Sequence, residues 1–390
     1  MAWKKMDVRE QRVEFVVRAL RATEPMSWLC REFGISRPTG YQWLERYREG
    51  GVAAIEERSR RPAHSPTQTA SEREARIRAL RAVYPDWGAR KLAVLLEREG
   101  VRMPSSTVHR VLLRLGLVRD ADRHAPAVKR FEREQPNELW QMDFKGPKNW
   151  PKSSTALSVL DDHSRYLVAL QATARPEGAL VRRHLEQAFI ECGLPEAMLM
   201  DHGVPWWNHQ SFAGATQLSL WLMRQGIRLY FSGVRHPQTQ GKVERFHGSM
   251  ERALNHRGVP EDDHQQWLDA FRYEHNFIRP HEALGMLTPA CRWQPSLRLY
   301  NSNPPPWEYP EGAWTLKIDN HGTIDIHNQS YRISKALVGE RVRLVEADER
   351  LLIYYCNTLI RELDLASHRA TIIANFVKFK PAESVPPPKE

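Results

Sequence analysis

The stretch that decides the fold runs from residue 236 to residue 247 and reads HPQTQGKVERFH. It joins a loop rich in Gly, Pro and Gln, Ser232–Gly241, to a long helix that is predicted from Lys242 to about His256. Glu244 therefore lies in the first turn of a helix, directly after a loop. A carboxylate there can serve a site at the edge of a sheet, or it can simply be a favourable charge at a helix N-terminus.

Two aspartates upstream lie in or beside predicted strands. Asp143 is inside the apolar strand Leu139–Phe144, and Asp201 follows the strand Ala197–Met200. Each has an ordinary explanation, since Asp143 could be a buried salt-bridge partner and Asp201 a turn former. If the three carboxylates converge at one edge of the sheet, they can cradle divalent cations. Phosphoryl transfer on DNA uses two such ions, about 3.5–4 Å apart.

Strand-like and helical segments alternate around these acids. Further strands are predicted at Ala156–Leu160, Tyr166–Leu170 and Ile227–Phe231, and helices at Gly178–Cys192, Phe212–Gln225 and Gln265–Phe277. The pair Asp161-Asp162 is interpreted as the turn between the first two of these strands rather than as catalytic. Three strands followed by alternating helices and strands imply an α/β domain, a mixed sheet with helices on both faces.

A helical region precedes this domain. Helices are predicted over residues 8–21, over 28–33 with Ser27 as the N-cap, and after Ser36, with Gly34 in the turn. This is the pattern of a helix-turn-helix, and a second copy follows in residues 71–118, where Ser105-Ser106 would cap the last helix. The alternative is a pair of plain helical bundles. Side chains that could reach DNA from the third helix are Arg37, Gln42, Arg46 and Arg48.

The charge distribution favours DNA binding by this region. The chain has 390 residues and a formal net charge of +10. Residues 1–135 contain 28 Lys and Arg against 18 Asp and Glu, so the whole excess lies in the first third. Arg58, Arg60 and Arg61 stand in the linker between the two helical units, where they suit a narrow minor groove or are simply solvated.

The composition argues against membrane, secreted, zinc-binding and disulfide-bonded proteins. Hydrophobic residues make up 41% and charged residues 27%, as in soluble globular proteins. The longest apolar runs are too short to span a bilayer and no signal segment is evident, so we expect a cytoplasmic, nucleoid-associated protein with no membrane partner. The cysteines form no CxxC pair, which argues against a zinc knuckle or disulfides, and each is expected to be buried: Cys30, Cys192, Cys291 and Cys356.

The C-terminal part is separated from the rest by the extended linker Asn303-Pro-Pro-Pro306. Short strands are predicted beyond it at Trp314–Ile318, Thr323–Ile326, Tyr331–Ile333, Val342–Val345 and Leu351–Tyr355. Strands of this length and spacing indicate a small β-barrel. The Pro/Lys/Glu-rich end from about Pro381 is expected to be disordered.

Three stretches resemble the DDE motifs of insertion-sequence transposases, which share the retroviral-integrase catalytic core: WQMDFK at 140–145, MDHG at 200–203 and HPQTQGKVERFH at 236–247. The likeness extends to LDDHSR at 160–165, to NFIRPH at 276–281 and to the flanking domains. It implies a ribonuclease-H-like fold in which two Mg²⁺ or Mn²⁺ ions are held by Asp143, Asp201 and Glu244. It also implies that Gly241 and Lys242 lie close to substrate DNA.

One position departs from this family. His202 stands where the family usually has Asn after its second Asp. This imidazole could stabilise the loop, contact a DNA phosphate or approach a metal ion. We expect that it stabilises the loop.

We therefore expect a multidomain protein that combines all-α helix-turn-helix domains, an α/β ribonuclease-H-like core and a small β-barrel. The predicted segments are a helix-turn-helix domain (1–58), a basic linker (59–70), a second helix-turn-helix or winged-helix-like domain (71–119), a basic linker (120–136), the catalytic core (137–298), a Pro-rich linker (299–311), the barrel (312–365) and a tail (366–390).

The resemblance implies a function as well. A DDE transposase cleaves DNA at transposon ends and joins the freed ends to target DNA, with no nucleotide cofactor and no covalent enzyme intermediate. Its partners would be terminal repeats, target DNA and further copies of the chain. An inactive, domesticated relative that only binds terminal repeats is the competing hypothesis. A nuclease for RNA–DNA hybrids on the same fold is another, although it would not need two helix-turn-helix units.

Overall fold

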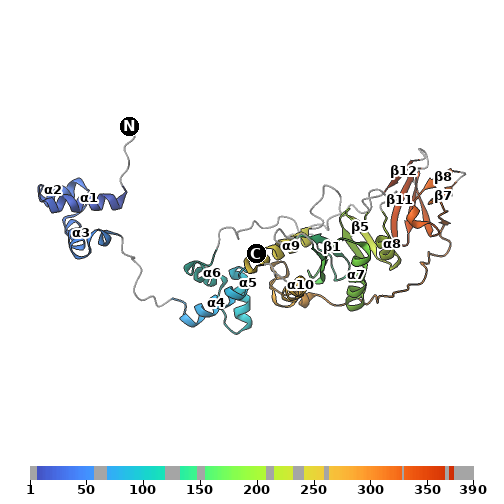
Figure 1. Cartoon of the computed structure of the whole chain (residues 1–390), viewed down its shortest axis with the longest axis horizontal. Helices are drawn as coiled ribbons and strands as arrows, with labels where there is room; N and C mark the ends of the chain where they lie inside the picture. Colours follow the sequence, from blue (N-terminus) through green and yellow to red (C-terminus); the bar gives the residue numbers. More distant parts are fainter. Residues whose placement is uncertain are drawn as a thin grey trace. The chain divides into compact units, whose positions relative to one another are not determined.

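The computed structural model describes residues 7–56, 68–118, 132–146, 154–207, 215–231, 241–258, 263–326, 329–364 and 369–372. They divide between two compact units, Met1–Thr69 and Ala70–Glu390 (Figure 1). No helix in the described part is long and apolar enough to cross a membrane.

The first unit is the predicted helix-turn-helix. It consists of α1 (Val8–Arg21), α2 (Met26–Glu32), α3 (Arg37–Gly50) and a 3-10 turn, Gly51–Ile55. As predicted, Ser36 caps α3, because its hydroxyl accepts a hydrogen bond from the N–H of Thr39 at 3.3 Å. The predicted cap at Ser27 is wrong, since α2 already begins at Met26 after Pro25. The helices cross closely at Gly40, where a Cβ would lie 2.7 Å from the sulfur of Cys30.

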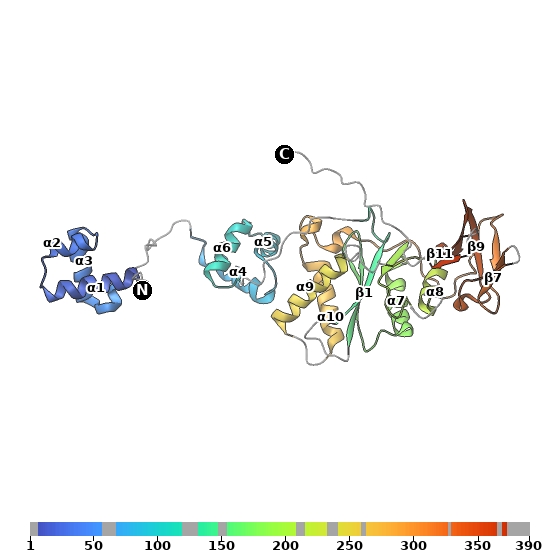
Figure 2. The same ribbon diagram turned by 90° about the horizontal axis from the view of Figure 1, so that it is seen from above.

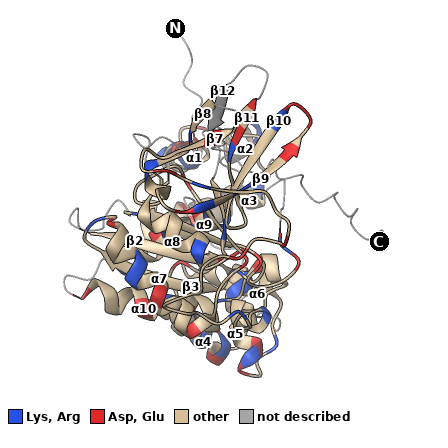
Figure 3. Ribbon diagram, turned by 90° about the vertical axis from the view of Figure 1, so that its right-hand side faces the viewer, with Lys and Arg blue, Asp and Glu red and all other residues tan. Residues whose placement is uncertain are grey.

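The second unit begins with the other helix-turn-helix, made of α4 (Ser71–Val83), α5 (Ala89–Arg98) and α6 (Ser105–Arg114). Trp87 is fully buried in its core. The predicted serine cap of α6 is wrong, because Pro104 is the N-cap and the helix starts at Ser105. Basic and acidic residues lie side by side on α4 and α5 (Figure 3), and Arg76 pairs with Glu99 at 2.5 Å.

A five-stranded sheet follows in the order β3-β2-β1-β4-β5. The first three strands pair in antiparallel fashion, whereas β4 is parallel to both β1 and β5. The mixed sheet is confirmed, with bounds within three residues of the predictions: β1 (Trp140–Lys145), β2 (Thr155–Asp161), β3 (Leu167–Thr173), β4 (Ala197–Met200) and β5 (Arg228–Phe231).

Helices cover both faces of this sheet (Figure 2). One face packs against α7 (Gly178–Cys192) and α8 (Gln217–Arg224), and the other against α9 (Gly241–Arg257) and α10 (His264–Tyr273). The prediction that α10 continues to Phe277 is wrong in detail, because a π-helical turn, Glu274–Ile278, replaces its last turn.

Charged side chains join the helical region to the segment that follows the sheet. The side chain of Asp86 is fully buried between two arginines. Its carboxylate accepts hydrogen bonds from Arg257 at 2.6 Å and from Arg279 at 3.0 Å. Ile278 packs against the apolar core of α4–α6. Since Arg257 is the last residue of α9, the helix that carries Glu244 at one end contacts the helical region at the other.

The C-terminal strands form two separate sheets among the described residues, so the predicted closure into a barrel is not confirmed. The larger has the order β12-β11-β10-β9-β6, and the smaller is the hairpin β7-β8. Two strands were not predicted, β11 and β12. The bounds are β6 (Thr315–Lys317), β7 (Thr323–Ile326), β8 (Gln329–Arg332), β9 (Arg341–Ala347), β10 (Arg350–Tyr355), β11 (Thr358–Asp364) and β12 (Arg369–Ile372).

Some expectations are corrected or lie beyond the described residues. Cys291 is exposed, contrary to prediction, because it lies in the surface turn Pro289–Arg292, whereas the other three cysteines are buried. Three predicted features fall outside the described part of the chain: the linker arginines Arg58, Arg60 and Arg61, the loop 232–240 and the tail from Pro381.

Candidate active site

Two aspartates meet where β1 and β4 run side by side. Gln141 on β1 is paired with Leu199 on β4, and the two aspartates lie two residues further along each chain. Because neighbouring strands lie about 4.8 Å apart, the backbones at Asp143 and Asp201 are adjacent. The parallel pairing thus brings together two residues that are 58 positions apart in the sequence.

The Asp143 side chain is oriented by a backbone hydrogen bond and is mostly buried. One carboxylate oxygen, Oδ1, accepts a hydrogen bond from the N–H of Phe144 at 2.8 Å. The side chain is 22% exposed. Burial, the charge of Asp201 and, to a smaller extent, that of Glu244 together raise the pKa of Asp143 to about 6, against the opposing effects of the Phe144 hydrogen bond and the charge of Lys145. Asp143 is therefore close enough to Asp201 and Glu244 to be affected by both negative charges.

Asp201 is held by its own loop. Its Oδ1 accepts hydrogen bonds from the N–H of Gly203 at 2.9 Å and from the indole N–H of Trp206 at 2.7 Å. Gly203 approaches so closely that a Cβ there would lie 2.8 Å from the same oxygen. Within the described part of the chain, no donor is hydrogen-bonded to Oδ2 of Asp201.

Glu244 is exposed in the first turn of α9. The start of this helix is tied to β1 by Gln141, a fully buried side chain. The amide oxygen of Gln141 accepts from the N–H of Val243 at 3.3 Å, and its amide nitrogen donates to Asp162 at 2.8 Å. Gln141 and Asp143 are two residues apart on one strand, so they face the same side of the sheet. The helix position that carries Glu244 is thereby fixed relative to Asp143.

Lys242 completes this attachment. Its ammonium group contacts the fully buried carboxylate of Asp162 and donates to the carbonyl oxygen of the same residue at 3.1 Å. Burial lowers the pKa of Lys242 to about 8, although the charge of Asp162 opposes this shift. The lysine that the resemblance places near DNA is thus 15% exposed and engaged with the protein. Beside it, a Cβ on Gly241 would meet no atom of the described residues within 4 Å.

Two histidines border the carboxylates. His247, one turn after Glu244, lies with Nδ1 3.6 Å from Asp143 and Nε2 3.0 Å from the hydroxyl of Ser158. Burial lowers the pKa of His247 to about 3, so its ring is neutral at neutral pH. His202 packs instead on two aromatic rings, with centroid distances of 5.0 Å to Trp207 and 5.6 Å to Phe231.

The donor set fits hard divalent cations. Mg²⁺ and Mn²⁺ prefer carboxylate oxygens and water, and this site offers such hard oxygen donors. Burial is the main cause of the raised pKa of Asp143, and the negative charges of Asp201 and Glu244 add to it. Among the residues that the structure describes, no three His, Cys, Asp or Glu side chains are arranged as a ready metal-ligand set. A cation would therefore have to draw the three carboxylates together.

The predicted DNA contacts on α3 are spread over its outer surface. Arg37, Gln42 and Arg48 are exposed, whereas the guanidinium of Arg46 is partly buried and lies 4.8 Å from the ring centroid of Trp43. Tyr41, which the sequence analysis did not single out, is 57% exposed on the same helix.

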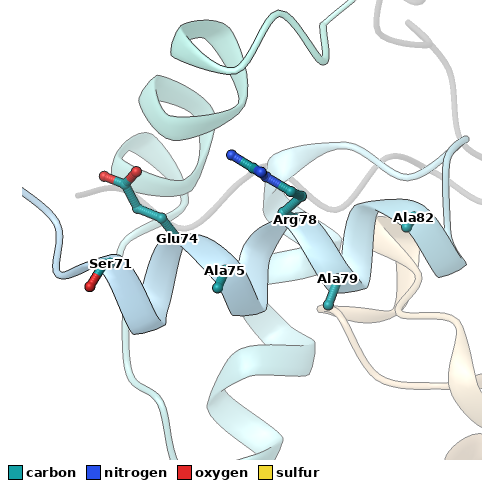
Figure 4. A pocket seen from close by; sticks show the side chains of 6 residues that line it. All are labelled: Ser71, Glu74, Ala75, Arg78, Ala79 and Ala82. Carbon is teal, nitrogen blue, oxygen red and sulfur yellow. The ribbon is translucent and has the colours of Figure 1, made fainter.

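A groove of about 590 Å³ runs along α4, away from the carboxylates (Figure 4). Small side chains and two charged ones line it, and its Glu74 is paired with Arg114. None of the three acids belongs to its lining residues, which are Ser71, Glu74, Ala75, Arg78, Ala79 and Ala82, so this hollow is not the active site.

Three site residues were missed by the sequence analysis. Gln141 could have been noticed as a polar residue on an apolar strand, two positions before Asp143. His247 could have been noticed because it follows Glu244 by three residues on the same helix face. For Trp206 the sequence carries no signal, since its partner Asp201 is contacted through a loop of irregular structure.

Comparisons with protein families match several parts of the chain. Two integrase core domain families match residues 133–237 and 225–289. A helix-turn-helix domain family matches residues 11–63, and a homeodomain-like domain family matches residues 39–112.

Curated relatives are similar over about half of the chain or more. An uncharacterized 31.7 kDa protein of insertion element IS407 from Burkholderia multivorans is 28% identical over 213 residues, which is 52% of this chain and 74% of the relative. An uncharacterized protein of insertion element IS476 from Xanthomonas euvesicatoria is 27% identical, over 61% of this chain and 69% of the relative. The transposase for transposon Tn552 from Staphylococcus aureus is 29% identical, over 54% of this chain and 49% of the relative.

Among solved structures, the HTLV-2 integrase catalytic core domain in complex with magnesium matches 41% of this chain and 97% of its own length, with a TM-score of 0.33 and 16% identity. The simian T-cell lymphotropic virus intasome in complex with a PP2A regulatory subunit matches 73% of this chain, with a TM-score of 0.35 and 14% identity.

Proposed function

We propose that this chain, an insertion-sequence transposase with an integrase catalytic core, cuts DNA at the ends of its element and joins those ends to target DNA with two divalent cations. The observation that carries this proposal is the meeting of Asp143 and Asp201 on parallel strands, with Glu244 close enough to raise the pKa of Asp143. Such a site fits a polynucleotidyl transferase in which metal ions would activate water or a DNA hydroxyl, so that no protein nucleophile is needed.

The three carboxylates would hold the cations, Asp143 and Asp201 from the sheet and Glu244 from α9. When bound, two such ions activate the attacking oxygen and stabilise the leaving oxygen of a phosphodiester. The protein's own residues would orient the carboxylates. The Phe144 N–H holds one oxygen of Asp143, and Gly203 with Trp206 holds one oxygen of Asp201. In both aspartates the other carboxylate oxygen, Oδ2, accepts none of these hydrogen bonds.

The reaction has two steps of the same kind. A water molecule attacks the phosphodiester at the transposon end, the P–O3′ bond breaks and a 3′-hydroxyl is released. That hydroxyl then attacks a phosphodiester of target DNA, so that one P–O bond forms as another breaks. No covalent protein–DNA species is needed, and the pairing of Lys242 with Asp162 leaves this amine committed to the protein.

The helical units would supply DNA recognition. The exposed α3 side chains Arg37, Gln42 and Arg48 suit a major groove, and Gly241 at the start of α9 leaves room for a DNA backbone near the carboxylates. Two element ends must be joined to one target, so a homo-oligomer assembled on terminal repeats is the form in which the chain would act.

The test uses the full chain with labelled DNA that carries the element's terminal repeats, a target plasmid and Mg²⁺ or Mn²⁺. Denaturing gels should show strands cut at the element end and longer strands joined to the target, in both cases free of protein. Binding without cutting by the wild-type chain would favour a domesticated DNA-binding protein. Cutting of RNA–DNA hybrids in preference to element ends would favour a nuclease. Either result would contradict the proposal.

A further inference from the structure

We propose that Trp206 is a positioning residue of the active site, which fixes the Asp201 carboxylate with its indole N–H and supports the Asp143 strand with its ring. This inference rests on the proposed function, because it assigns a role to Trp206 in the same cation site. Trp206 lies in the loop after β4, three residues beyond Gly203.

The first contact is a hydrogen bond to the carboxylate. The indole nitrogen of Trp206 is 2.7 Å from Oδ1 of Asp201, and the N–H of Gly203 donates to the same oxygen at 2.9 Å. A hydrogen bond to an ionised acceptor is short and stronger than one between neutral groups. Because both donors use one oxygen, the orientation of the carboxylate is set and Oδ2 is left for a cation.

The second contact is an aromatic stack between Trp206 and Phe144, the residue that follows Asp143. The ring of Trp206 lies nearly parallel to that of Phe144, with centroids 5.2 Å apart and an angle of 9°. Phe144 is the residue whose N–H donates to Asp143. The Trp206 side chain, which is 1% exposed, therefore contacts both Asp201 and Phe144, the residue that orients Asp143.

Burial alone does not explain this arrangement. Trp221, on α8, is also buried at 6% exposure, yet its indole N–H has no hydrogen-bond partner within the described part of the chain. Among the described residues, the ring of Trp221 contacts Arg182 and Phe189 without a hydrogen bond from its N–H. Trp206 differs because its N–H reaches a carboxylate of the site. Groups that orient metal ligands affect metal affinity by about 10–100-fold when they are removed.

The experiment compares Trp206→Phe with Trp221→Phe in the full chain. Both substitutions remove an indole N–H and keep a buried aromatic ring, but only the first removes a hydrogen bond to Asp201. Mn²⁺ binding is measured by electron paramagnetic resonance, and thermal unfolding is followed in EDTA. Trp206→Phe should weaken Mn²⁺ binding about 10–100-fold and raise the Mg²⁺ concentration that half-saturates strand transfer, whereas Trp221→Phe should leave both unchanged.

Two further variants separate a failure of the positioning role from a failure of the proposed function. Phe144→Leu removes the ring stack and keeps the backbone hydrogen bond, so it should weaken Mn²⁺ binding by less than Trp206→Phe, and it serves if the latter fails to fold. Asp201→Asn should abolish tight Mn²⁺ binding. If Asp201→Asn has no effect on Mn²⁺, the proposed function fails. If Asp201→Asn abolishes binding while Trp206→Phe and Phe144→Leu bind like wild type, only the positioning role is overturned.

Discussion

Asp143→Asn should stabilise the metal-free protein although it removes one of the three carboxylates proposed to bind the cations. Burial and the neighbouring acids raise the pKa of Asp143 from 3.8 to about 6. Each pKa unit is about 1.4 kcal/mol, so ionising this carboxyl in the folded protein costs up to about 3 kcal/mol. Asparagine carries no such charge and can still accept the hydrogen bond from Phe144. After allowance for solvent screening, the gain in free energy of unfolding should be about 1–3 kcal/mol at neutral pH.

The sign of the pH dependence follows from the raised pKa. Between about pH 4 and 6 the folded protein holds the proton of Asp143 more tightly than the unfolded chain does. The wild-type protein therefore loses stability as the pH rises through this range, and the full cost is present above pH 6. The advantage of Asp143→Asn should accordingly be about 1.4 kcal/mol larger at pH 7.5 than at pH 5.

The assay is denaturant unfolding of wild type, Asp143→Asn and Glu244→Gln in EDTA at these two pH values. Glu244 is exposed, so its variant serves as a control that should differ little from wild type in stability. Adding Mg²⁺ should then stabilise the wild-type chain and leave Asp143→Asn unaffected, because a ligand stabilises only the form that binds it. The reasoning is refuted if Asp143→Asn is less stable than wild type at pH 7.5, or if its advantage shrinks as the pH rises.

Three other predictions concern separate parts of the chain. His202→Asn should keep the rate of strand transfer in Mg²⁺ within about tenfold of the wild-type rate, a change of ~1.4 kcal/mol in barrier, because the His202 ring packs on Trp207 and Phe231. A change in which metal ion supports the reaction would show instead that the imidazole takes part in the chemistry. Asp86→Asn should lower the free energy of unfolding by about 3–5 kcal/mol, because the buried guanidinium of Arg279 loses its carboxylate partner, whereas Arg257 keeps its pairing with Glu274. A neutral effect in urea unfolding would contradict this role of Asp86. A fragment of residues 1–69, which forms a compact unit, should bind terminal-repeat DNA with an affinity that falls steeply as salt rises, and equal binding to random DNA would contradict its recognition role.

The parts of the fold that were predicted from the sequence are those with strong local patterns. The strand Ala197–Met200 and the helix Gly178–Cys192 were predicted with the bounds observed, because continuous apolar runs and helical spacing mark them. Strand β11 was missed because its Arg361 is fully buried, which breaks the alternation of apolar and polar residues that marks a strand. The end of α10 was misjudged because the change to a π-helical turn leaves no mark on apolar periodicity.

For the candidate active site, the three carboxylates were proposed from the sequence, whereas the contacts that hold them in place could not be predicted. Helix position alone cannot tell whether Lys242 points to DNA or into the protein, because its partner Asp162 is 80 residues away in the sequence. The same holds for Trp206, whose hydrogen bond to Asp201 depends on how an irregular loop closes. Such contacts arise from tertiary packing, which periodicity and spacing do not encode.

The most direct test of the central claim is strand transfer by four purified full-length chains: wild type, Asp143→Asn, Asp201→Asn and Glu244→Gln. Each reaction contains terminal-repeat DNA, target plasmid and Mg²⁺, and DNA binding is measured in parallel. The account predicts that every single variant loses about a thousandfold or more of the activity, ~4 kcal/mol in barrier, while binding DNA as the wild type does. Wild-type strand transfer by any one of the three variants would contradict the claim that these carboxylates form one active site.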